Sequence, residues 1–322
     1  MKNTYILKES SLVVNSIFSI IGIFLFIYSP ITLSKTYQLN EQSNIVGMVK
    51  IITSKWGDTL PTVGRRHSMG GEEMEDANPA VDYWQPKVGS RIVIPSRYIL
   101  PDASQKGIVI NIAEMRLYYY HPKNNTVTTF PVAIGKEGWR TPIGKTKIIR
   151  MRENPTWVVP ESIIADRRKN NMKVFKTMPP GPKNPLGKYA MNLGFKNIVI
   201  HGTPWPLGVG LRTSHGCLRM MPEHIEQLYT MVGVGTEVNI VYQPSKVGYD
   251  ARQVYLEVHE NFNASMNQAS LSLSDRFQAV ASMLSKQTNI NWKKNHNGIR
   301  LGYGYPMPVG RFYRQNSTLS QR

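Results

Sequence analysis

The sequence predicts a mainly β chain of about two domains behind an N-terminal export helix. Three observations carry this prediction: a length of 322 residues, many short β-branched and aromatic runs separated by Gly and Pro, and one apolar stretch near the N-terminus. Domains commonly have about 100–200 residues. Short strands broken at intervals by turn residues are typical of a β-sandwich or barrel.

The composition excludes several classes of protein. Hydrophobic residues make up 41% of the chain, which is enough for a sizeable core and excludes wholesale disorder. A single cysteine excludes a disulfide framework and multi-cysteine metal sites. The net charge of +18 predicts an anionic partner: nucleic acid, an acidic membrane face or a carboxylate-rich polymer.

Residues 1–34 have the pattern of a signal peptide or signal anchor. Lys2 and Lys8 precede an apolar run at 12–28, and Pro30 and polar residues follow. The run of about 17 residues could also remain as a membrane anchor. We therefore expect an exported protein, which argues against nucleic acid as the partner.

Residues 35–45 are polar and predict a linker, and residues 46–96 predict a compact block with the order strand, helices, strand. This block resembles a LysM module, a small βααβ unit that binds N-acetylglucosamine-containing glycans. The resemblance rests on G-D-T-L at 57–60, N-P at 78–79 between the expected helices, and V-G-S-x-I-x-I-P at 88–95. It implies glycan binding; the alternative is a spacer of the same fold without a ligand.

Residues 105–242 predict the larger, all-β domain. Its insertion at about 152–187 is rich in Pro, Asn, Arg and Lys, which is typical of a lid or binding loop. Residues 243–322 predict a basic, partly disordered extension with one strand at 254–258 and one amphipathic helix at 271–284. The expected strands of the larger domain lie at 107–112, 115–120, 126–134, 146–151, 189–193, 198–201 and 237–242.

The single cysteine, Cys217, is the candidate nucleophile. A free cysteine is commonly a small buried hydrophobe, but His215, Arg212 and Arg219 lie within five residues of this one. Such cationic neighbours favour the thiolate, and an unperturbed thiol, with a pKa near 8.5, is largely protonated at neutral pH. Gly216 precedes the cysteine and permits a backbone conformation closed to other residues.

His201 ends an apolar run and offers a second imidazole. Together with His215 and Cys217 it also supplies ligand types that zinc accepts. Flanking arginines would repel a dication, and no carboxylate lies nearby in the sequence to orient the histidines. We therefore expect a catalytic thiol, no metal and no cofactor. We expect three tryptophans either to line a substrate groove or to lie in the core of the domain: Trp139, Trp157 and Trp205.

Residues 105–242 resemble the L,D-transpeptidase catalytic domain, also called the YkuD domain. The resemblance rests on H-G-T at 201–203 and S-H-G-C-L-R at 214–219, with support from A-E-M-R-L-Y-Y-Y at 113–120. It implies a YkuD-type β-sandwich or barrel. With the LysM-like block and the export segment, the layout is similar to that of periplasmic enzymes that attach the outer-membrane lipoprotein to peptidoglycan.

The resemblance also implies roles for individual residues. Cys217 would attack an L-centre–D-centre peptide bond in the stem tetrapeptide, release D-Ala and form a thioester. His201 would carry the proton, oriented by the backbone carbonyl of Gly202. The other implied roles are site shape for His215 and Ser214, oxyanion stabilisation by backbone N–H groups near Gly216 and Cys217, and carboxylate binding by Arg219.

The acceptor of the acyl group remains open at this point. A diaminopimelate amine would give a cross-link, a lipoprotein lysine would give anchoring, and water would give L,D-carboxypeptidase trimming. Two further alternatives are a wall-binding LysM protein with a catalytically idle domain and a cysteine peptidase acting on proteins. The expected partners are peptidoglycan stem peptides and glycan, an outer-membrane lipoprotein, and the inner membrane if the N-terminal segment is not cleaved.

Overall fold

The computed structural model describes residues 34–259, 288–290 and 302–312. Almost all of the expected export segment and the expected helix at 271–284 lie outside the described residues. Within the described ranges, no helix has the length and apolar character needed to cross a membrane.

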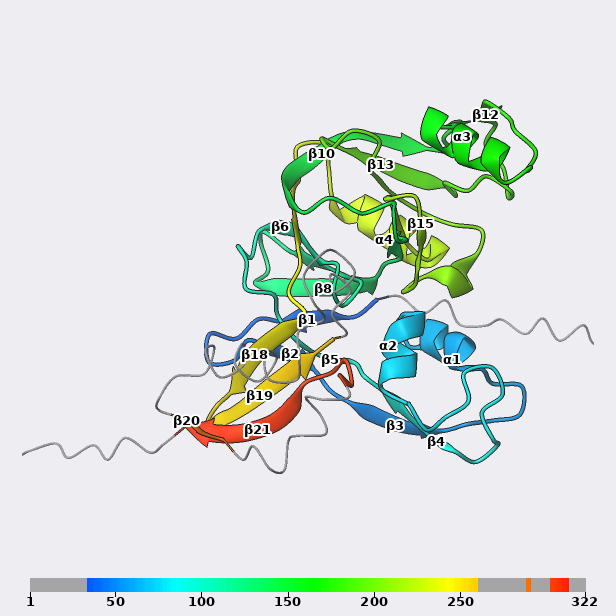
Figure 1. The fold of residues 1–322 in the computed structure, drawn as a ribbon. Helices are drawn as coiled ribbons and strands as arrows, with labels where there is room; N and C mark the ends of the chain where they lie inside the picture. The colour runs from blue at the N-terminus through cyan, green and yellow to red at the C-terminus, as the bar shows by residue number, and fades with distance from the viewer. Residues whose placement is uncertain (1–33, 260–287, 291–301, 313–322) are drawn as a thin grey trace, which may run out of the picture. The chain divides into compact units, whose positions relative to one another are not determined.

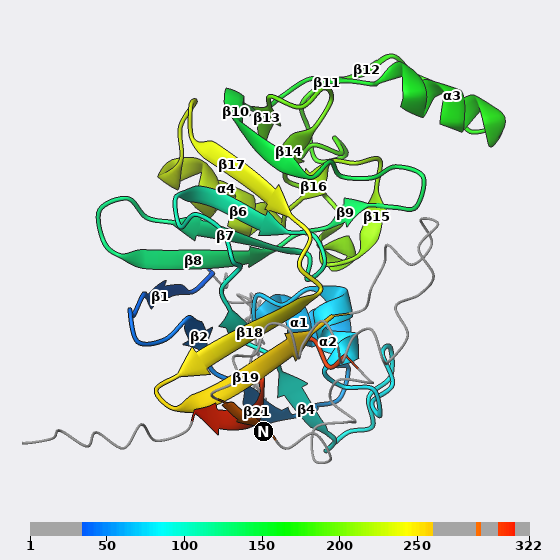
Figure 2. The ribbon, with the colours of Figure 1, turned by 60° about the vertical axis from the view of Figure 1, so that its left-hand side comes forward.

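A nine-stranded sheet organises the larger domain, which confirms the mainly β prediction. Figure 2 shows β8, β7, β6 and β17 side by side. Neighbouring strands are antiparallel except for the pairs β6–β17 and β14–β16, which are parallel. In sheet order the strands are β1 (Thr36–Gln38), β8 (Thr126–Pro131), β7 (Arg116–Tyr120), β6 (Gly107–Asn111), β17 (Glu237–Val241), β10 (Gly144–Glu153), β13 (Tyr189–Leu193), β14 (Val199–His201) and β16 (Leu218–Arg219).

Strand β1 corrects the prediction of a linker at 35–45. Its three residues, Thr36–Gln38, pair with β8 at the edge of the sheet. The segment is too short and polar to show a strand pattern in the sequence. Its pairing comes from the exposed edge of β8, whose backbone groups need partners.

The alternation of side chains along β7 gives the sheet two cores. Tyr119 packs in one core with α4 (Pro222–Met231), whereas Tyr118 and Tyr120 pack in the other with α1 (Leu60–Arg66) and α2 (Gly71–Asp76). This is the period-2 pattern of a strand that is covered on both faces. The helices of the small module therefore share a core with the nine-stranded sheet.

The small module has the expected βααβ order. Its strands β3 (Lys50–Thr53) and β4 (Arg91–Ile94) form an antiparallel pair, and the two helices lie between them in the chain. Pro61 lies in the first turn of α1, where its missing N–H costs little. Asn78 follows α2 rather than lying between the helices, and its side chain bonds the backbone of Met74 and Val93.

The chain after residue 243 is folded where it is described. Strands β18 (Ser245–Asp250), β19 (Gln253–Val258), β21 (Met307–Phe312) and β20 (Thr288–Ile290) form a four-stranded sheet in that order (Figure 1). The predicted strand at 254–258 is confirmed. Val254, Leu256 and Val309 of this part of the chain are buried in a third core.

The insertion has its own secondary structure. Strands β11 (Trp157–Val158) and β12 (Thr177–Met178) pair antiparallel, and α3 (Glu161–Lys169) lies between them in the chain. Closer to the cysteine, β9 (Ile134–Gly135) and β15 (Arg212–Ser214) form a parallel pair. The remaining elements are β2 (Ile45–Gly47), β5 (Arg97–Ile99) and a 3-10 turn at Pro206–Gly208.

Candidate active site

The strands β10, β13, β14 and β16 give the site two distinct faces. The register aligns Met191 of β13 with Ile200 of β14, and Ile200 with Leu218 of β16. These three side chains are buried in the core beneath the sheet. Because successive side chains of a strand alternate between faces, their neighbours point away from this core. One row of neighbours is Arg150, Asn192 and Val199, and the next is Arg152, Ala190, His201 and Arg219.

A cavity of about 800 Å³ lies on this second face, and the insertion contributes to its wall. Trp157 and Trp205 line it, which fits the groove alternative for these two tryptophans. The predicted site residues meet here although they are separated in the chain. Those that line the cavity are His201, Ser214, His215, Cys217 and Arg219.

The turn before Cys217 is held from inside by Ser214. The buried Ser214 Oγ donates to the Cys217 carbonyl at 2.6 Å and accepts from the Gly216 N–H at 3.1 Å. Gly216 has φ +96°, and a Cβ there would lie 3.3 Å from the Arg140 carbonyl oxygen and from Ile198 Cδ1. Thr141 Oγ1 donates to the Gly216 carbonyl at 3.0 Å. Gly216 is therefore required for the shape of the turn.

The two backbone N–H groups next to the thiol, those of Gly216 and Cys217, differ in their hydrogen bonding. Because the Gly216 N–H donates to Ser214, it is engaged within the turn. The Cys217 N–H makes no hydrogen bond to any described residue. It is the better-placed backbone donor for a negative oxygen at the thiol.

The Cys217 thiol is more weakly acidic than the sequence suggests. Burial raises its pKa and outweighs the hydrogen bond from the Val199 backbone and the charge of Arg219, both of which lower it. Its sulfur donates to the Asn197 carbonyl at 3.4 Å. Arg219 favours the thiolate as expected, but desolvation is the larger effect and disfavours the charged form in the resting site.

His201 is a buried, neutral imidazole in a defined orientation. Its Nδ1 lies 2.6 Å from the Gly202 carbonyl oxygen, the contact that the family resemblance implies. Because a carbonyl only accepts, Nδ1 carries the proton and Nε2 keeps its lone pair at neutral pH. Burial, and then the charge of Arg219, lowers the pKa of His201 to about 4. The ring can therefore accept a proton at neutral pH.

His215 has a partner that sequence reasoning missed. Its Nε2 lies 3.3 Å from the Asp166 carboxylate of α3, and its ring packs edge-on against Trp139 with 4.5 Å between ring centroids. Burial lowers the pKa of His215, whereas Asp166 raises it. The argument that no carboxylate orients these histidines is thus wrong, because α3 brings one from 49 residues away.

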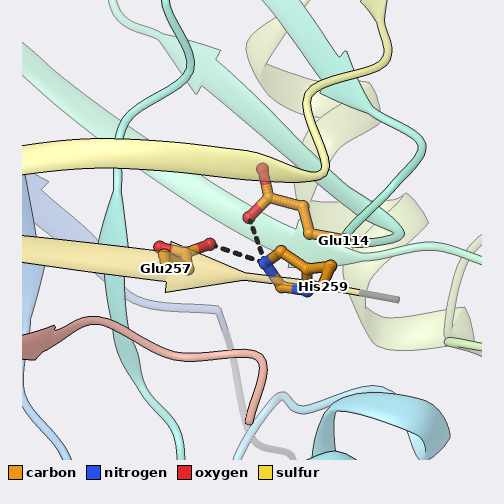
Figure 3. A group of neighbouring side chains, drawn as sticks. All are labelled: Glu114, Glu257 and His259. Atoms are coloured by element: carbon orange, nitrogen blue, oxygen red, sulfur yellow. Dashed lines mark hydrogen bonds and ion pairs between the residues drawn. The ribbon is translucent and has the colours of Figure 1, made fainter. Parts of the chain in front are cut away.

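A separate buried cluster contains potential metal ligands. Single ligand atoms of Glu114, Glu257 and His259 lie within 4.8 Å of one another (Figure 3). Lys246 Nζ lies 2.8 Å from Glu114 and 2.7 Å from Glu257, so an ammonium group already supplies the positive charge between the carboxylates. Its pairing holds the pKa of Glu257 at about 2 despite burial. We read this cluster as an ion-pair network.

The comparisons with known proteins give the family of the chain. A family model for the YkuD L,D-transpeptidase catalytic domain matches residues 105–240. The chain is 41% identical over 237 residues to the probable L,D-transpeptidase ErfK/SrfK of Escherichia coli K12, covering 72% of this chain and 76% of that protein. This chain belongs to the L,D-transpeptidase family. As an L,D-transpeptidase it is also similar to the probable L,D-transpeptidase YbiS of the same organism, with 42% identity over 70% of this chain and 74% of that one.

Among solved structures, the catalytic domain of an Enterococcus faecium L,D-transpeptidase has a TM-score of 0.33 and 21% identity to this L,D-transpeptidase. The match covers 44% of this chain and all of that one.

Proposed function

We propose that the chain is an L,D-transpeptidase of peptidoglycan stem tetrapeptides that works through a thioester on Cys217. The observation that carries this proposal is the presence of Cys217 and His201 in one cavity, at the ends of paired strands, within a chain of this family. The orientation of His201 by Gly202 supports a proton-transfer role. Arg219, in the same row as His201, would bind a substrate carboxylate.

The protonation states favour one order of events. The neutral thiol gives its proton to His201 Nε2 as the sulfur attacks the peptide carbonyl, and the Cys217 N–H donates to the oxyanion. The tetrahedral intermediate then collapses to a thioester, and His201 returns the proton to the departing D-Ala amine. An acceptor amine attacks the thioester, loses its proton to His201, and the thiol is restored.

The decisive experiment follows the acyl-enzyme by intact-protein mass spectrometry. Wild-type protein with a synthetic stem tetrapeptide should gain the acyl mass and lose it when an amine acceptor is added, whereas Cys217→Ala should do neither. Lys145→Gln, an exposed change on β10 outside the cavity, is the control. Full transfer by Cys217→Ala would contradict the proposal.

The proposal extends to the cell wall as the working environment. An exported enzyme in the periplasm would meet stem peptides as donors and either diaminopimelate, a lipoprotein lysine or water as acceptor. Mass spectrometry of muropeptides from cells with and without the protein separates these acceptors. Cross-linked stems, stems with lipoprotein remnants and shortened stems have different masses.

A second candidate function is glycan binding by the small module. Trp56 is 91% exposed and Trp84 is 62% exposed, and both lie on this module. Exposed indole rings can stack on apolar sugar faces, and large exposed apolar groups often indicate binding surfaces. Trp56→Ala and Trp84→Ala should weaken co-sedimentation with sacculi while acylation of Cys217 is unchanged. Undiminished sedimentation of the double variant would contradict glycan binding at this surface.

A further inference from the structure

The wall of the active-site cavity is strongly cationic. Arginine and lysine side chains line it on several sides, and the described lining contains no Asp or Glu. Such a cavity favours an anionic ligand and raises its local concentration. The cationic lining residues are Arg150, Arg152, Arg167, Lys183 and Arg219.

A β-bulge in β10 turns two of these arginines toward the cavity. The pairing with β13 shifts between Ile148 and Arg150, so that Ile149 is the extra residue. Ile148 is buried in the core, and without the bulge Arg150 would point to the same face. With the bulge, Arg150 and Arg152 line the cavity instead. Bulges beside active sites commonly re-aim side chains in this way.

Polar atoms beside these arginines lack partners. Arg152 Nε and Asn192 Oδ1 are buried and have no hydrogen-bond partner among the described residues. Elsewhere on the same guanidinium, Arg152 Nη1 donates to the Thr156 carbonyl at 3.3 Å. Arg150 lies opposite Asn192 in the register of the two strands. The positive charges of Arg150 and Arg152 repel each other. Buried polar atoms without partners are costly, and a ligand would satisfy them.

We propose that Arg150, Arg152 and Asn192 form a second carboxylate subsite, which selects donor stems with free carboxylates over the corresponding carboxamides. The inference rests on the proposed function. The guanidinium groups would donate to the carboxylate, and Asn192 Oδ1 would accept from a peptide N–H beside it. In the sheet order β10, β13, β14, β16, this subsite lies on the opposite side of His201 from Arg219.

A carboxylate bound in the subsite would also change the pKa of His201. Arg152 is one of the charges that lower the pKa of the imidazole. A bound carboxylate offsets that charge, so the acid limb of acylation should lie at higher pH with the acidic donor than with the amidated one. A purely structural role for Arg152 would not make this limb depend on the donor.

The test compares two synthetic stem tetrapeptides that differ only in side-chain carboxylate or carboxamide groups. Initial rates of acyl-enzyme formation on Cys217 are measured for wild type, Arg150→Gln, Arg152→Gln and the control Lys145→Gln. Wild type and the control should prefer the acidic donor by about tenfold to a hundredfold, as expected for charge-assisted hydrogen bonds. The arginine variants should lose most of this preference.

The outcomes separate the two proposals. Equal wild-type rates with both donors would overturn the subsite alone, as would an equal loss with both donors in Arg150→Gln, which changes an exposed residue. Absence of an acyl-enzyme from either donor on wild type would overturn the proposed function and the subsite with it.

Discussion

At the scale of single residues, Cys217 is a neutral thiol and His201 a neutral imidazole, and both line the same cavity. Burial raises the pKa of the thiol and lowers that of the imidazole. Both shifts disfavour a preformed ion pair. In the proposed mechanism, His201 therefore takes the proton during attack, and the rate depends on the free lone pair of its Nε2.

The pH profile follows from this arrangement. Acylation of Cys217 by a carbapenem probe should persist from pH 7 to pH 5 and fall only near pH 4, where His201 becomes protonated. The unfolded chain takes up this proton near pH 6.5, so folding stability also declines as the pH falls from there through 4. Circular dichroism at each pH separates unfolding from loss of the base. An acid limb near pH 6.5 in folded protein would contradict the assignment.

Gly216 should tolerate no side chain. Gly216→Ala should destabilise the protein by about 1–3 kcal/mol, because φ +96° is closed to L side chains and the Cβ would press on Arg140 and Ile198. Urea unfolding measures the stability, and probe acylation reports on the turn. Gly208→Ala, with no neighbouring atom within 4 Å, is the control and should be nearly neutral.

At the scale of elements, a partly exposed contact ties α3 of the insertion to His215. The Asp166 and His215 side chains are 26% and 21% exposed, so the contact is worth at most about 1 kcal/mol. Its effect should therefore be local to α3.

Asp166→Asn should accelerate hydrogen exchange in α3 by about two- to fivefold and leave global stability nearly unchanged. Hydrogen–deuterium exchange with mass spectrometry measures this for the peptide that contains the helix. Glu161→Gln, which breaks a more exposed pair on the same helix, is the matched control. Unchanged exchange in Asp166→Asn would show that the contact does not hold α3.

The elements that sequence reasoning predicts are those whose pattern is local. The β-branched and aromatic alternation of β6, β7 and β8 and the block around Cys217 could be read directly. Strand β1 and the Asp166–His215 contact could not, because each depends on a partner far along the chain. Arg150 and Arg152 are two positions apart and therefore point to one face of a strand, but the bulge determines which face that is.

At the scale of the whole molecule, two charged residues two positions apart connect three parts of the chain. Glu114 pairs with Lys246 of the C-terminal sheet, and Arg116 pairs with Glu73 of the small module at 2.6 Å. Both pairs are almost fully buried. Next to the second pair, Gly70 and Gly210 approach so closely that neither has room for a Cβ. The small module is thus packed directly on the segment that leads to Cys217.

Breaking the buried pair should be far more damaging than breaking an exposed one. Glu73→Gln leaves the Arg116 charge buried without a counterion and should lower the free energy of unfolding by about 3–5 kcal/mol. Glu226→Gln removes an exposed partner of Lys188 and should leave the free energy of unfolding nearly unchanged. Urea titration of the two variants beside wild type measures both. Equal losses would contradict the importance of burial.

The buried ion pairs of Glu114 and Arg116 limit which catalytic domains could replace this one. A chimera that replaces residues 105–240 with a catalytic domain lacking Glu114 and Arg116 would leave the buried Glu73 charge without its guanidinium partner, and Lys246 would keep only Glu257 of its two carboxylate partners. Exchange of a module is therefore viable only when its charged partner travels with it. The part of the chain that must be exchanged together is therefore larger than the catalytic domain alone.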